Sequence, residues 1–184
     1  MKFVAVPYGR GSLGKNDGCK SAPLVLLHKE IHTNVEIVSI DEANVDNTMK
    51  TISETKGDFF VGGDHSITYG SFKGFAHGFN NPGIIVFDAH PDLEEATNSV
   101  SHEDYLRKLI EEGSLPKQNV ILVGIRSISE NERAFMKGLT VYPMEEVFRN
   151  EEAVCDLLME RAQNFDGVYL SIDIDVLDPA FAPG

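Results

Sequence analysis

The sequence predicts an α/β fold in which a mostly parallel β-sheet is covered by helices on both faces. Two observations carry this prediction. Short β-rich runs alternate with helical segments along the 184 residues. The β-rich runs are also almost continuously apolar, as in strands that are buried on both faces. The composition, 42% hydrophobic and 24% charged, fits one globular domain over residues 1–184.

The elements follow one another in regular order. The predicted strands cover residues 2–7, 35–40, 58–62, 83–88, 119–125 and 167–173, with a weaker run at 139–143. The predicted helices cover about 21–32, 43–56, 66–78, 101–112, 129–137 and 150–164. Ser21 with Pro23 just inside fits a helix start, and Gly113 fits a helix stop. Parallel sheets bind ligands beyond the carboxyl ends of their strands, so functional side chains are expected there.

The net charge indicates which kinds of partner to expect, and the cysteine content indicates the redox compartment. The net charge of −13 and the pI near 4.8 argue against nucleic acid and anionic membranes as partners and favour a cationic ligand. Cys19 and Cys155 form no recognisable framework, which predicts reduced thiols in a cytoplasmic protein. No signal-peptide pattern and no run of membrane-spanning length is present in the sequence.

Acidic and imidazole side chains follow three of the predicted strands. "GGDHS" supplies Asp64 and His65, "DAHPD" supplies Asp88, His90 and Asp92, and "SIDIDVLDP" supplies Asp173 and Asp175. In the third stretch the acids alternate with isoleucine and valine, the period of a strand, which predicts a strand with one apolar and one acidic face.

Four carboxylates near one sheet edge are costly to bury unless cations neutralise them, and two divalent ions would balance their charge. A ligand set of carboxylates with two imidazoles and no thiol disfavours structural zinc, calcium and magnesium and favours manganese. Each motif alone also fits a helix cap, a turn or a loop acid. Their occurrence together at successive strand ends favours a two-metal site.

"GGDHS", "DAHPD" and "SIDIDVLDPAFAPG", in this order, resemble the three signatures of the ureohydrolase family, which includes arginase, agmatinase and formimidoylglutamase. "VGIRS" and "YPMEEV" are also similar to family segments, and the agmatinase-like members are the nearest in character. The resemblance implies a three-layer α/β/α sandwich of the arginase type that holds two manganese ions. The family pattern continues past "PG" with a further strand and a helix. The resemblance therefore implies a C-terminally truncated domain, which also lacks the glutamate that faces the guanidinium, and a homo-oligomer when the protein is full length.

Carried over residue by residue, the resemblance implies that His65 and Asp92 bind one ion, that His90 and Asp175 bind the other, and that Asp88 and Asp173 bridge both. Asp64 and Asp178 match acids that support such ligands. Two ions can share a water and lower its pKa, so that hydroxide attacks the guanidinium carbon and urea and an amine are released. His102 in "VSHEDYL" matches the histidine that carries a proton to the amine, and Asp92 is counted with it as catalytic.

The resemblance implies Glu94 and Asn98 as substrate residues, at positions where arginases hold the substrate carboxylate. A glutamate about 6 Å from a carboxylate would cost on the order of 3 kcal/mol at an effective dielectric near 20, roughly a hundredfold penalty against arginine. Glu94, or Glu95 beside it, would instead attract the terminal ammonium of agmatine, which predicts hydrolysis of agmatine to putrescine. Phe148 stands where an arginase acid receives the α-ammonium. Glu94 pointing to solvent is the alternative.

Three other functions stay open from the sequence. One is arginase or formimidoylglutamase activity on another guanidino or formimino substrate. Another is a histone-deacetylase-like hydrolase, which shares the broad fold but uses one zinc and a reduced ligand set. The third is a non-catalytic binding protein or an inactive fragment.

Overall fold

The structure is a computed structural model that describes residues 1–15, 17–28 and 34–182. The chain forms two compact units, one made of Met1–Phe75 with Ala96–Tyr105 and the other of Ala76–Glu95 with Leu106–Gly184. Among the described residues, every helix is too short or too polar to cross a membrane.

The first unit contains a parallel three-stranded sheet with the order β2-β1-β3. Its strands are β1 (Phe3–Val6), β2 (Val35–Ile37) and β3 (Phe59–Gly62). Phe3 of the central strand pairs with Val35 on one side and with Phe59 on the other. The rest of β1 is buried, because its apolar residues are enclosed on both faces of the sheet.

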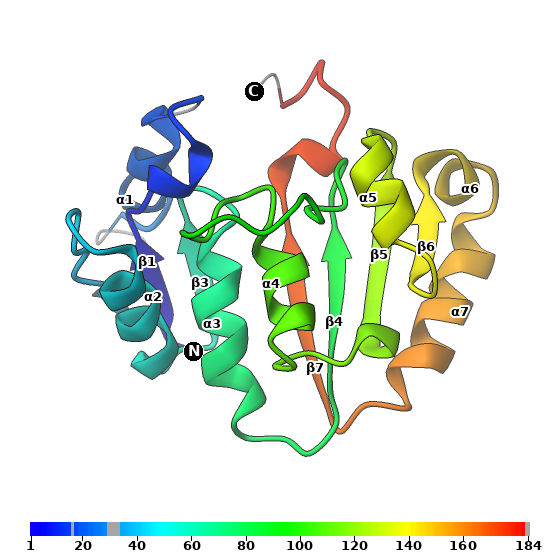
Figure 1. Ribbon diagram of the computed structural model, residues 1–184, viewed down its shortest axis with the longest axis horizontal. Coiled ribbons are helices and arrows are strands. Elements are labelled where there is room, and N and C mark those ends of the chain that lie inside the picture. The colour runs from blue at the N-terminus through cyan, green and yellow to red at the C-terminus, as the bar shows by residue number, and fades with distance from the viewer. Residues whose placement is uncertain (16, 29–33, 183–184) are drawn as a thin grey trace. The chain divides into compact units, whose positions relative to one another are not determined.

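The helical elements of the first unit are η1 (Arg10–Ser12), η2 (Asp17–Ser21), α1 (Ala22–Leu26), α2 (Val45–Glu54) and α3 (Ile67–Ala76). Helices α2 and α3 lie side by side (Figure 1). Glycine makes this close approach possible, since a Cβ atom on Gly74 would come within 2.2 Å of the Ser53 carbonyl oxygen.

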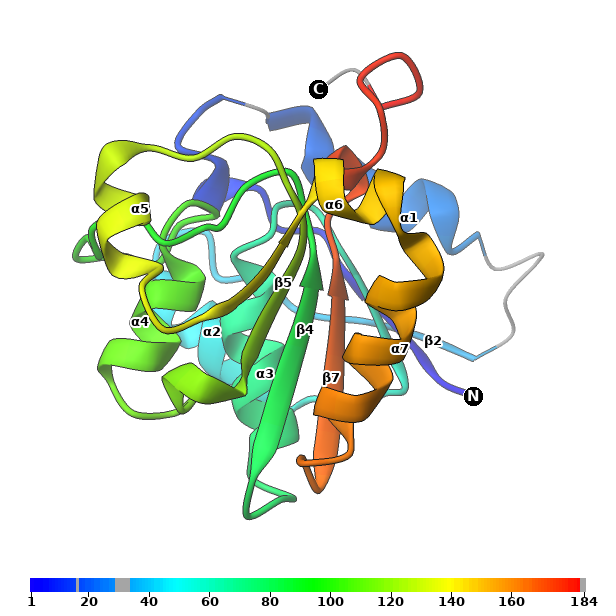
Figure 2. The same cartoon turned by 90° about the vertical axis from the view of Figure 1, so that its right-hand side faces the viewer.

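The second unit contains a parallel four-stranded sheet with the order β6-β5-β4-β7. Its strands are β4 (Pro82–Phe87), β5 (Val120–Ile125), β6 (Thr140–Pro143) and β7 (Gly167–Ile172). Its helical elements are α4 (Tyr105–Glu111), whose first residue belongs to the first unit, η3 (Lys117–Asn119), α5 (Glu130–Phe135), α6 (Met144–Arg149), α7 (Glu151–Ala162) and η4 (Ile174–Val176). Helix α7 covers one face of this sheet, and α4 and α5 cover the other (Figure 2).

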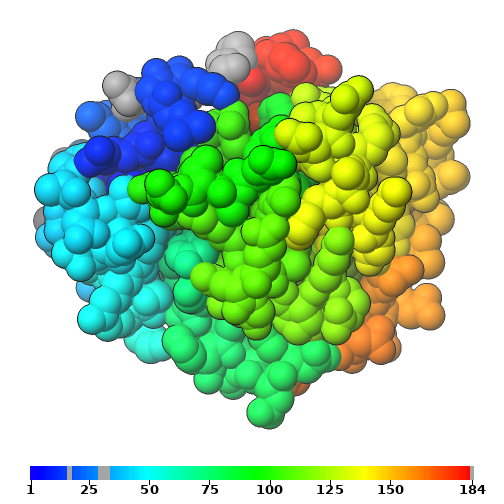
Figure 3. Space-filling view, in the orientation of Figure 1, coloured from blue at the N-terminus to red at the C-terminus, as the bar shows by residue number. Residues whose placement is uncertain are grey.

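The core of the second unit lies between α7 and the sheet. Val154 and Leu158, one helical turn apart on α7, pack with Ile85, Ile121 and other apolar residues of the strands. Most other residues of α7 are exposed, and the helix, in orange, forms part of the surface in Figure 3. The face of α7 that carries Val154 and Leu158 is therefore the face that packs on the sheet.

The predicted fold class is confirmed, since both sheets are parallel and helices separate the strands in sequence. All seven predicted strands are present, each within a few residues of its predicted bounds. The predicted helix over 21–32 is wrong in length: its α-helical part is Ala22–Leu26, preceded by η2, and residues 29–33 lie outside the described residues. Pro23 stands in the first turn as expected, while the Ser21 side chain makes no capping hydrogen bond.

One further helix prediction needs correction, and one helix was missed. The helix expected over 101–112 begins only at Tyr105, after a turn over residues 102–104 in which the Asp104 backbone N–H donates to the Ser101 carbonyl oxygen. Helix α6 was not predicted. It starts directly after Pro143, which ends β6 and cannot donate a hydrogen bond to continue the ladder.

Strand β7 departs from the expected burial. It is an edge strand of the four-stranded sheet, and Val168, Leu170 and Ile172 on one of its faces are 41%, 56% and 64% exposed. Its other face is more enclosed, with Ser171 buried. The prediction of a strand buried on both faces therefore holds for β4 and β5 but not for β7.

Candidate metal centre

Strands β4 and β7 bring two of the acidic motifs together in the second unit. These strands are neighbours, and Phe87 at the end of β4 pairs with Ile172 at the end of β7. The next residues, Asp88 and Asp173, therefore emerge side by side at the carboxyl edge of the sheet. The Asp173 backbone N–H donates to the Phe87 carbonyl oxygen at 2.8 Å and fixes this register beyond the last strand pair.

The acids after β7 lie on a turn and not on a strand face. Strand β7 ends at Ile172, and η4 carries Asp175. The Asp173 carboxylate accepts the Asp175 backbone N–H at 3.0 Å and so caps this short helix. The prediction of an alternating acidic strand face is therefore wrong. The local hydrogen bond of an aspartate to the backbone two residues on competes with the extended conformation.

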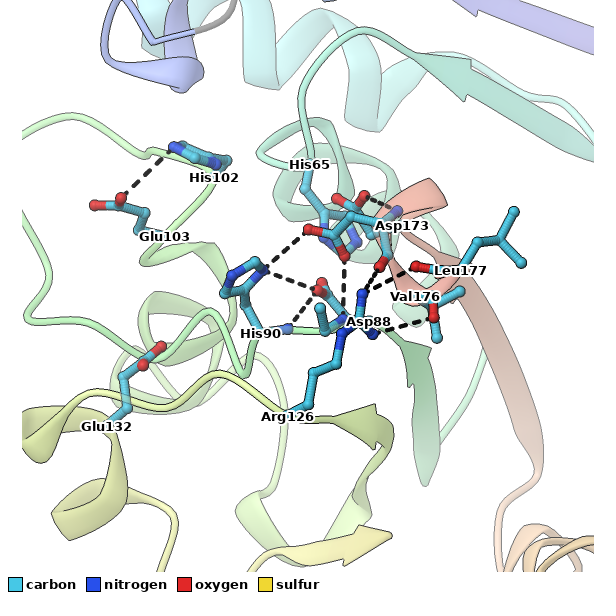
Figure 4. A network of polar contacts seen from close by, with 12 residues as sticks. His65, Asp88, His90, His102, Glu103, Arg126, Glu132, Asp173, Val176 and Leu177 are labelled. Carbon is cyan, nitrogen blue, oxygen red and sulfur yellow. Dashed lines mark hydrogen bonds and ion pairs between the residues drawn. The ribbon is translucent and has the colours of Figure 1, made fainter. Parts of the chain in front are cut away.

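The turn brings Asp175 to the "DAHPD" segment. The Ala89 backbone N–H donates to Asp175 Oδ1 at 3.1 Å, and His90 Nδ1 lies 3.0 Å from Asp175 Oδ2. The His90 backbone N–H donates to Asp88 Oδ1 at 2.7 Å. One ligand atom each from Asp88, His90 and Asp175 lies within 4.8 Å of the other two. The contacts of Asp88 and His90 are drawn in Figure 4.

The negative charges of the carboxylates in this cluster favour a nearby cation. The hydrogen bond to Asp175, then the hydrogen bond to Asp88, raises the pKa of His90 to about 10, against the opposing effect of burial. Asp88 is almost completely buried. The imidazolium thus neutralises part of the carboxylate charge. Two carboxylates and an imidazole that converge on one point also form a donor set that a divalent transition-metal ion can use in place of that proton.

Arg126 fixes the turn that carries Asp175. Its guanidinium donates to the carbonyl oxygens of Asp175, Val176 and Leu177, the last two at 3.1 and 2.9 Å (Figure 4). Gly124, on β5, has a φ of +94°, and a Cβ atom there would lie 2.7 Å from the Val176 side chain. The left-handed backbone and the close approach both require glycine. Strand β5 and the residue after it therefore contact the turn that carries Asp175.

Asp92 closes the "DAHPD" segment with a φ of +52° and a buried side chain. The conformation is uncommon for a residue with a side chain and is tolerated best by Asp and Asn. The next residue is anchored, because the Leu93 backbone N–H donates to Glu132 Oε1 at 3.2 Å. Glu132 also forms a capping box with Ser129 at the start of α5.

In the first unit, "GGDHS" follows β3 and packs against the turn after β1. Asp64 Oδ1 accepts the Ser66 backbone N–H at 3.0 Å, and burial raises the pKa of the Asp64 carboxyl. A Cβ atom on Gly11 would come within 2.5 Å of Asp64, so only glycine fits there. The Gly11 carbonyl accepts the His102 backbone N–H at 3.0 Å, which places the expected proton carrier on a fixed backbone.

His65 contacts an aromatic neighbour. Its Nε2 atom lies 3.2 Å from the Tyr105 hydroxyl, and the two ring centroids are 4.6 Å apart. Both side chains are buried. The predicted pairing of His65 with Asp92 at one ion joins residues of the two units and stays a prediction, as do the bridging roles of Asp88 and Asp173.

The substrate residues expected from the sequence have different surroundings. Glu94 is partly buried, whereas Glu95 and Asn98 are exposed. Phe148 is 89% exposed on α6. Asp178 is exposed, and its Oδ1 accepts the Ala180 backbone N–H at 2.8 Å, so it forms a turn here. The roles of Glu94, Asn98 and Asp178 remain predictions.

Three contact residues were not singled out from the sequence, namely Tyr105, Arg126 and Glu132. The Ser129-x-x-Glu132 spacing is the pattern of a capping box and could have identified Glu132. Arg126 lies in "VGIRS", and nothing local indicates that it binds carbonyl groups about 50 residues later. Tyr105 has no local signal either, since its partner is 40 residues earlier.

The fold and the site define a class of protein: a parallel α/β chain with aspartates and a histidine clustered at its strand ends. The model of the Arginase family matches residues 16–184. The arginase of Bacillus subtilis is 33% identical over 177 residues, which cover 85% of this chain and 59% of that protein. The formimidoylglutamase of Halalkalibacterium halodurans is 33% identical over 167 residues, covering 84% of this chain and 52% of that protein.

Solved structures agree. The crystal structure of arginase from Bacillus subtilis has a TM-score of 0.80 at 29% identity and covers 100% of this chain and 78% of that chain. Formimidoylglutamase from the same species has a TM-score of 0.86 at 24% identity over 100% of this chain and 67% of that chain, a likeness of fold. The chain belongs to the arginase family. It spans between half and three-fifths of the length of these two curated relatives.

Proposed function

We propose that this protein is a dinuclear manganese hydrolase that cleaves a guanidino C–N bond and releases urea and an amine. The observation that supports it best is the convergence of Asp88, His90 and Asp175 at the strand ends of a chain of the arginase family. Membership of that family favours this function over the deacetylase-like alternative.

The ligand assignment follows the family resemblance. His65 and Asp92 would hold one ion, His90 and Asp175 the other, and Asp88 and Asp173 both. Bound in this way, the two ions would supply an activated water and charge stabilisation at the guanidino carbon. The carboxylate-rich set with two imidazoles favours manganese over zinc.

The residues of the chain itself prepare the site for this chemistry. The cap by Asp173 and the three carbonyl contacts of Arg126 hold Asp175 in place before any metal binds. His102 would carry a proton to the departing amine nitrogen, because a neutral amine is a far better leaving group than an amide ion. Its side chain is about one-third exposed.

Agmatine is the proposed substrate. Glu94 is partly buried, so its carboxylate charge is less screened than that of a fully exposed residue. A negative charge there would attract the terminal ammonium of agmatine and repel the α-carboxylate of arginine. The names of the relatives favour a second candidate, the hydrolysis of arginine or of formiminoglutamate, since two relatives that match are called arginase and formimidoylglutamase.

Metal analysis and product assays test these proposals. The whole protein, loaded with Mn²⁺, should hold two ions and release urea from agmatine faster than from arginine, with formamide release from formiminoglutamate measured in parallel. Glu94→Asn should shift the preference toward arginine, and Glu95→Gln tests whether its exposed neighbour acts instead. Arginine preferred by the wild type, or a preference unchanged in both variants, would contradict the agmatine assignment. A whole protein that binds no metal and releases no urea would contradict the proposed hydrolase.

For the whole protein we also propose a homo-oligomer that acts on a small cationic substrate and binds neither nucleic acid nor membranes. Light scattering of the purified protein would measure its oligomeric state, and sedimentation of its mixtures with DNA or with anionic vesicles should show no binding.

A further inference from the structure

The hydroxyl of Tyr105 meets the ring of His65 in a buried contact that the proposed reaction does not use. The Tyr105 side chain is fully buried, and its oxygen lies 3.2 Å from His65 Nε2. The two rings are tilted by 46° with centroids 4.6 Å apart, so they also pack against each other. The contact fixes both the position and the rotation of the imidazole.

The segment before Tyr105 is itself locked. The buried Asp104 carboxylate accepts the Ser101 backbone N–H at 2.6 Å, the Thr97 backbone N–H at 2.9 Å and the Thr97 hydroxyl at 3.0 Å. The His102 backbone N–H donates to Gly11 at 3.0 Å. The residues before Tyr105 therefore hold the first turn of α4 in place. The Tyr105 hydroxyl contacts His65 before a metal ion binds, so no entropy of ordering Tyr105 is lost when it does.

We propose that Tyr105 is a positioning residue whose hydroxyl oxygen accepts the Nε2–H of His65 and so presents Nδ1 as the nitrogen that binds metal. This inference rests on the proposed function, in which His65 is a ligand. A histidine ligand carries its remaining proton on the nitrogen that faces away from the metal, and an oxygen acceptor there holds the tautomer and the ring orientation. Tyr105 supplies that acceptor from within the same unit as His65.

The first test uses the metal-free protein. Long-range ¹H–¹⁵N correlation spectra report which ring nitrogen of a neutral histidine carries the proton, and His65→Gln identifies the His65 signals. The wild type should show His65 protonated on Nε2, with an N–H that is protected from exchange with water. Tyr105→Phe keeps the ring and removes the oxygen, and the protected N–H should disappear. A neutral His65 protonated on Nδ1 in the wild type would overturn the proposal.

The second test measures manganese affinity by titration calorimetry. Tyr105→Phe should weaken one of the two sites by about 10- to 100-fold and leave the other near its wild-type affinity. Tyr142→Phe is the matched control, since it removes a hydroxyl from another buried tyrosine, in the core beneath α7. Equal wild-type affinity at both sites in Tyr105→Phe would also overturn the proposal.

Urea release separates this inference from the proposed function. A wild type that binds two manganese ions but releases no urea from any guanidino substrate refutes the hydrolase, while the Nε2–H signal and the weakened site in Tyr105→Phe would still uphold the role of Tyr105. Normal urea release with unchanged metal binding in Tyr105→Phe refutes only the role of Tyr105.

Discussion

His90 Nδ1 lies 3.0 Å from Asp175 Oδ2, although 85 residues separate the two in sequence. The pairing of β4 with β7 and the turn after β7 bring them together. Because a carboxylate and an imidazole at this distance can share either a proton or a metal ion, this contact is the structural centre of the proposed site.

Replacement of Asp173 should empty more of the site than replacement of Asp175. Asp173 is expected to bridge both ions, and it also caps the turn that carries Asp175. Asp173→Ala should therefore lose both manganese ions, whereas Asp175→Ala should mainly weaken one. Elemental analysis of the purified variants measures this.

Asp173→Asn is the control that separates the two roles of Asp173. It keeps an oxygen that can accept the Asp175 N–H but removes the charge of the ligand. Loss of metal in Asp173→Asn with unchanged thermal stability would identify ligation as the main role. Two tightly bound ions in Asp173→Ala would rule out the bridging assignment.

Arg126 should stabilise the ligand turn through its three carbonyl contacts. Arg126→Met should lower the free energy of unfolding by about 1–2 kcal/mol, because three carbonyl groups lose a charged donor at a partly hydrated site. It should also weaken manganese binding through Asp175. Denaturant unfolding measures the free energy of unfolding, and metal titration measures the manganese affinity.

Arg149→Met is the matched control for Arg126. Arg149 forms an exposed ion pair with Glu145 one turn away on α6, and such pairs contribute on the order of 0.5 kcal/mol or less. Equal losses of stability in the two variants would show that the carbonyl contacts of Arg126 add nothing.

Removal of the Asp104 carboxylate should loosen the segment that carries His102 and Tyr105. Asp104→Ala leaves the buried Ser101 N–H and the Thr97 N–H without their acceptor, at an expected loss of about 2–3 kcal/mol in the free energy of unfolding. Hydrogen exchange should speed up across residues 97–105 more than in β4 or β5. Uniform acceleration over the whole chain would instead indicate a global loss of stability.

Asp41 should make stability depend on pH in the acidic range. A hydrogen bond from the Asn47 side chain, then one from the Ala43 backbone, lowers the pKa of the Asp41 carboxyl below its usual 3.8. The folded state therefore favours the charged form. The stabilisation is present above the unfolded-state pKa and is lost as the pH falls through the lowered folded-state pKa.

Asp41→Ala should consequently be less stable than the wild type at about pH 6, with the difference shrinking toward about pH 3. Urea unfolding at the two pH values measures it, and Asp156→Ala on the exposed side of α7 serves as the control. A difference that grows on acidification would contradict the sign of this prediction.

The sequence by itself determined the order and the type of the strands and of every long helix, and among the described α-helices missed only the short helix α6. Apolar β-rich runs such as "GIIVFD" and "NVILVGI" predict β4 and β5 because buried parallel strands need apolar side chains on both faces. The same apolar runs also made it possible to identify the acids and histidines at the strand ends from the sequence. A charged residue directly after such a run stands out, and parallel topology collects the strand ends at one edge.

Tertiary structure decided what those side chains do locally. The alternation in "SIDIDV" predicts a continued strand, yet Asp173 captures the Asp175 N–H and turns the chain. There one side chain offers the backbone a hydrogen bond that competes with the extended conformation, and periodicity does not register that competition.

Only the folded chain shows the contacts of Arg126 with Val176 and of Tyr105 with His65, which join residues 50 and 40 positions apart. Hydrophobic periodicity reports which face of an element is buried, because burial acts on every residue of that face. A single hydrogen bond between distant segments leaves no such repeated pattern. It depends on strand register and on one side-chain geometry, and these are set when the sheet and its loops pack together.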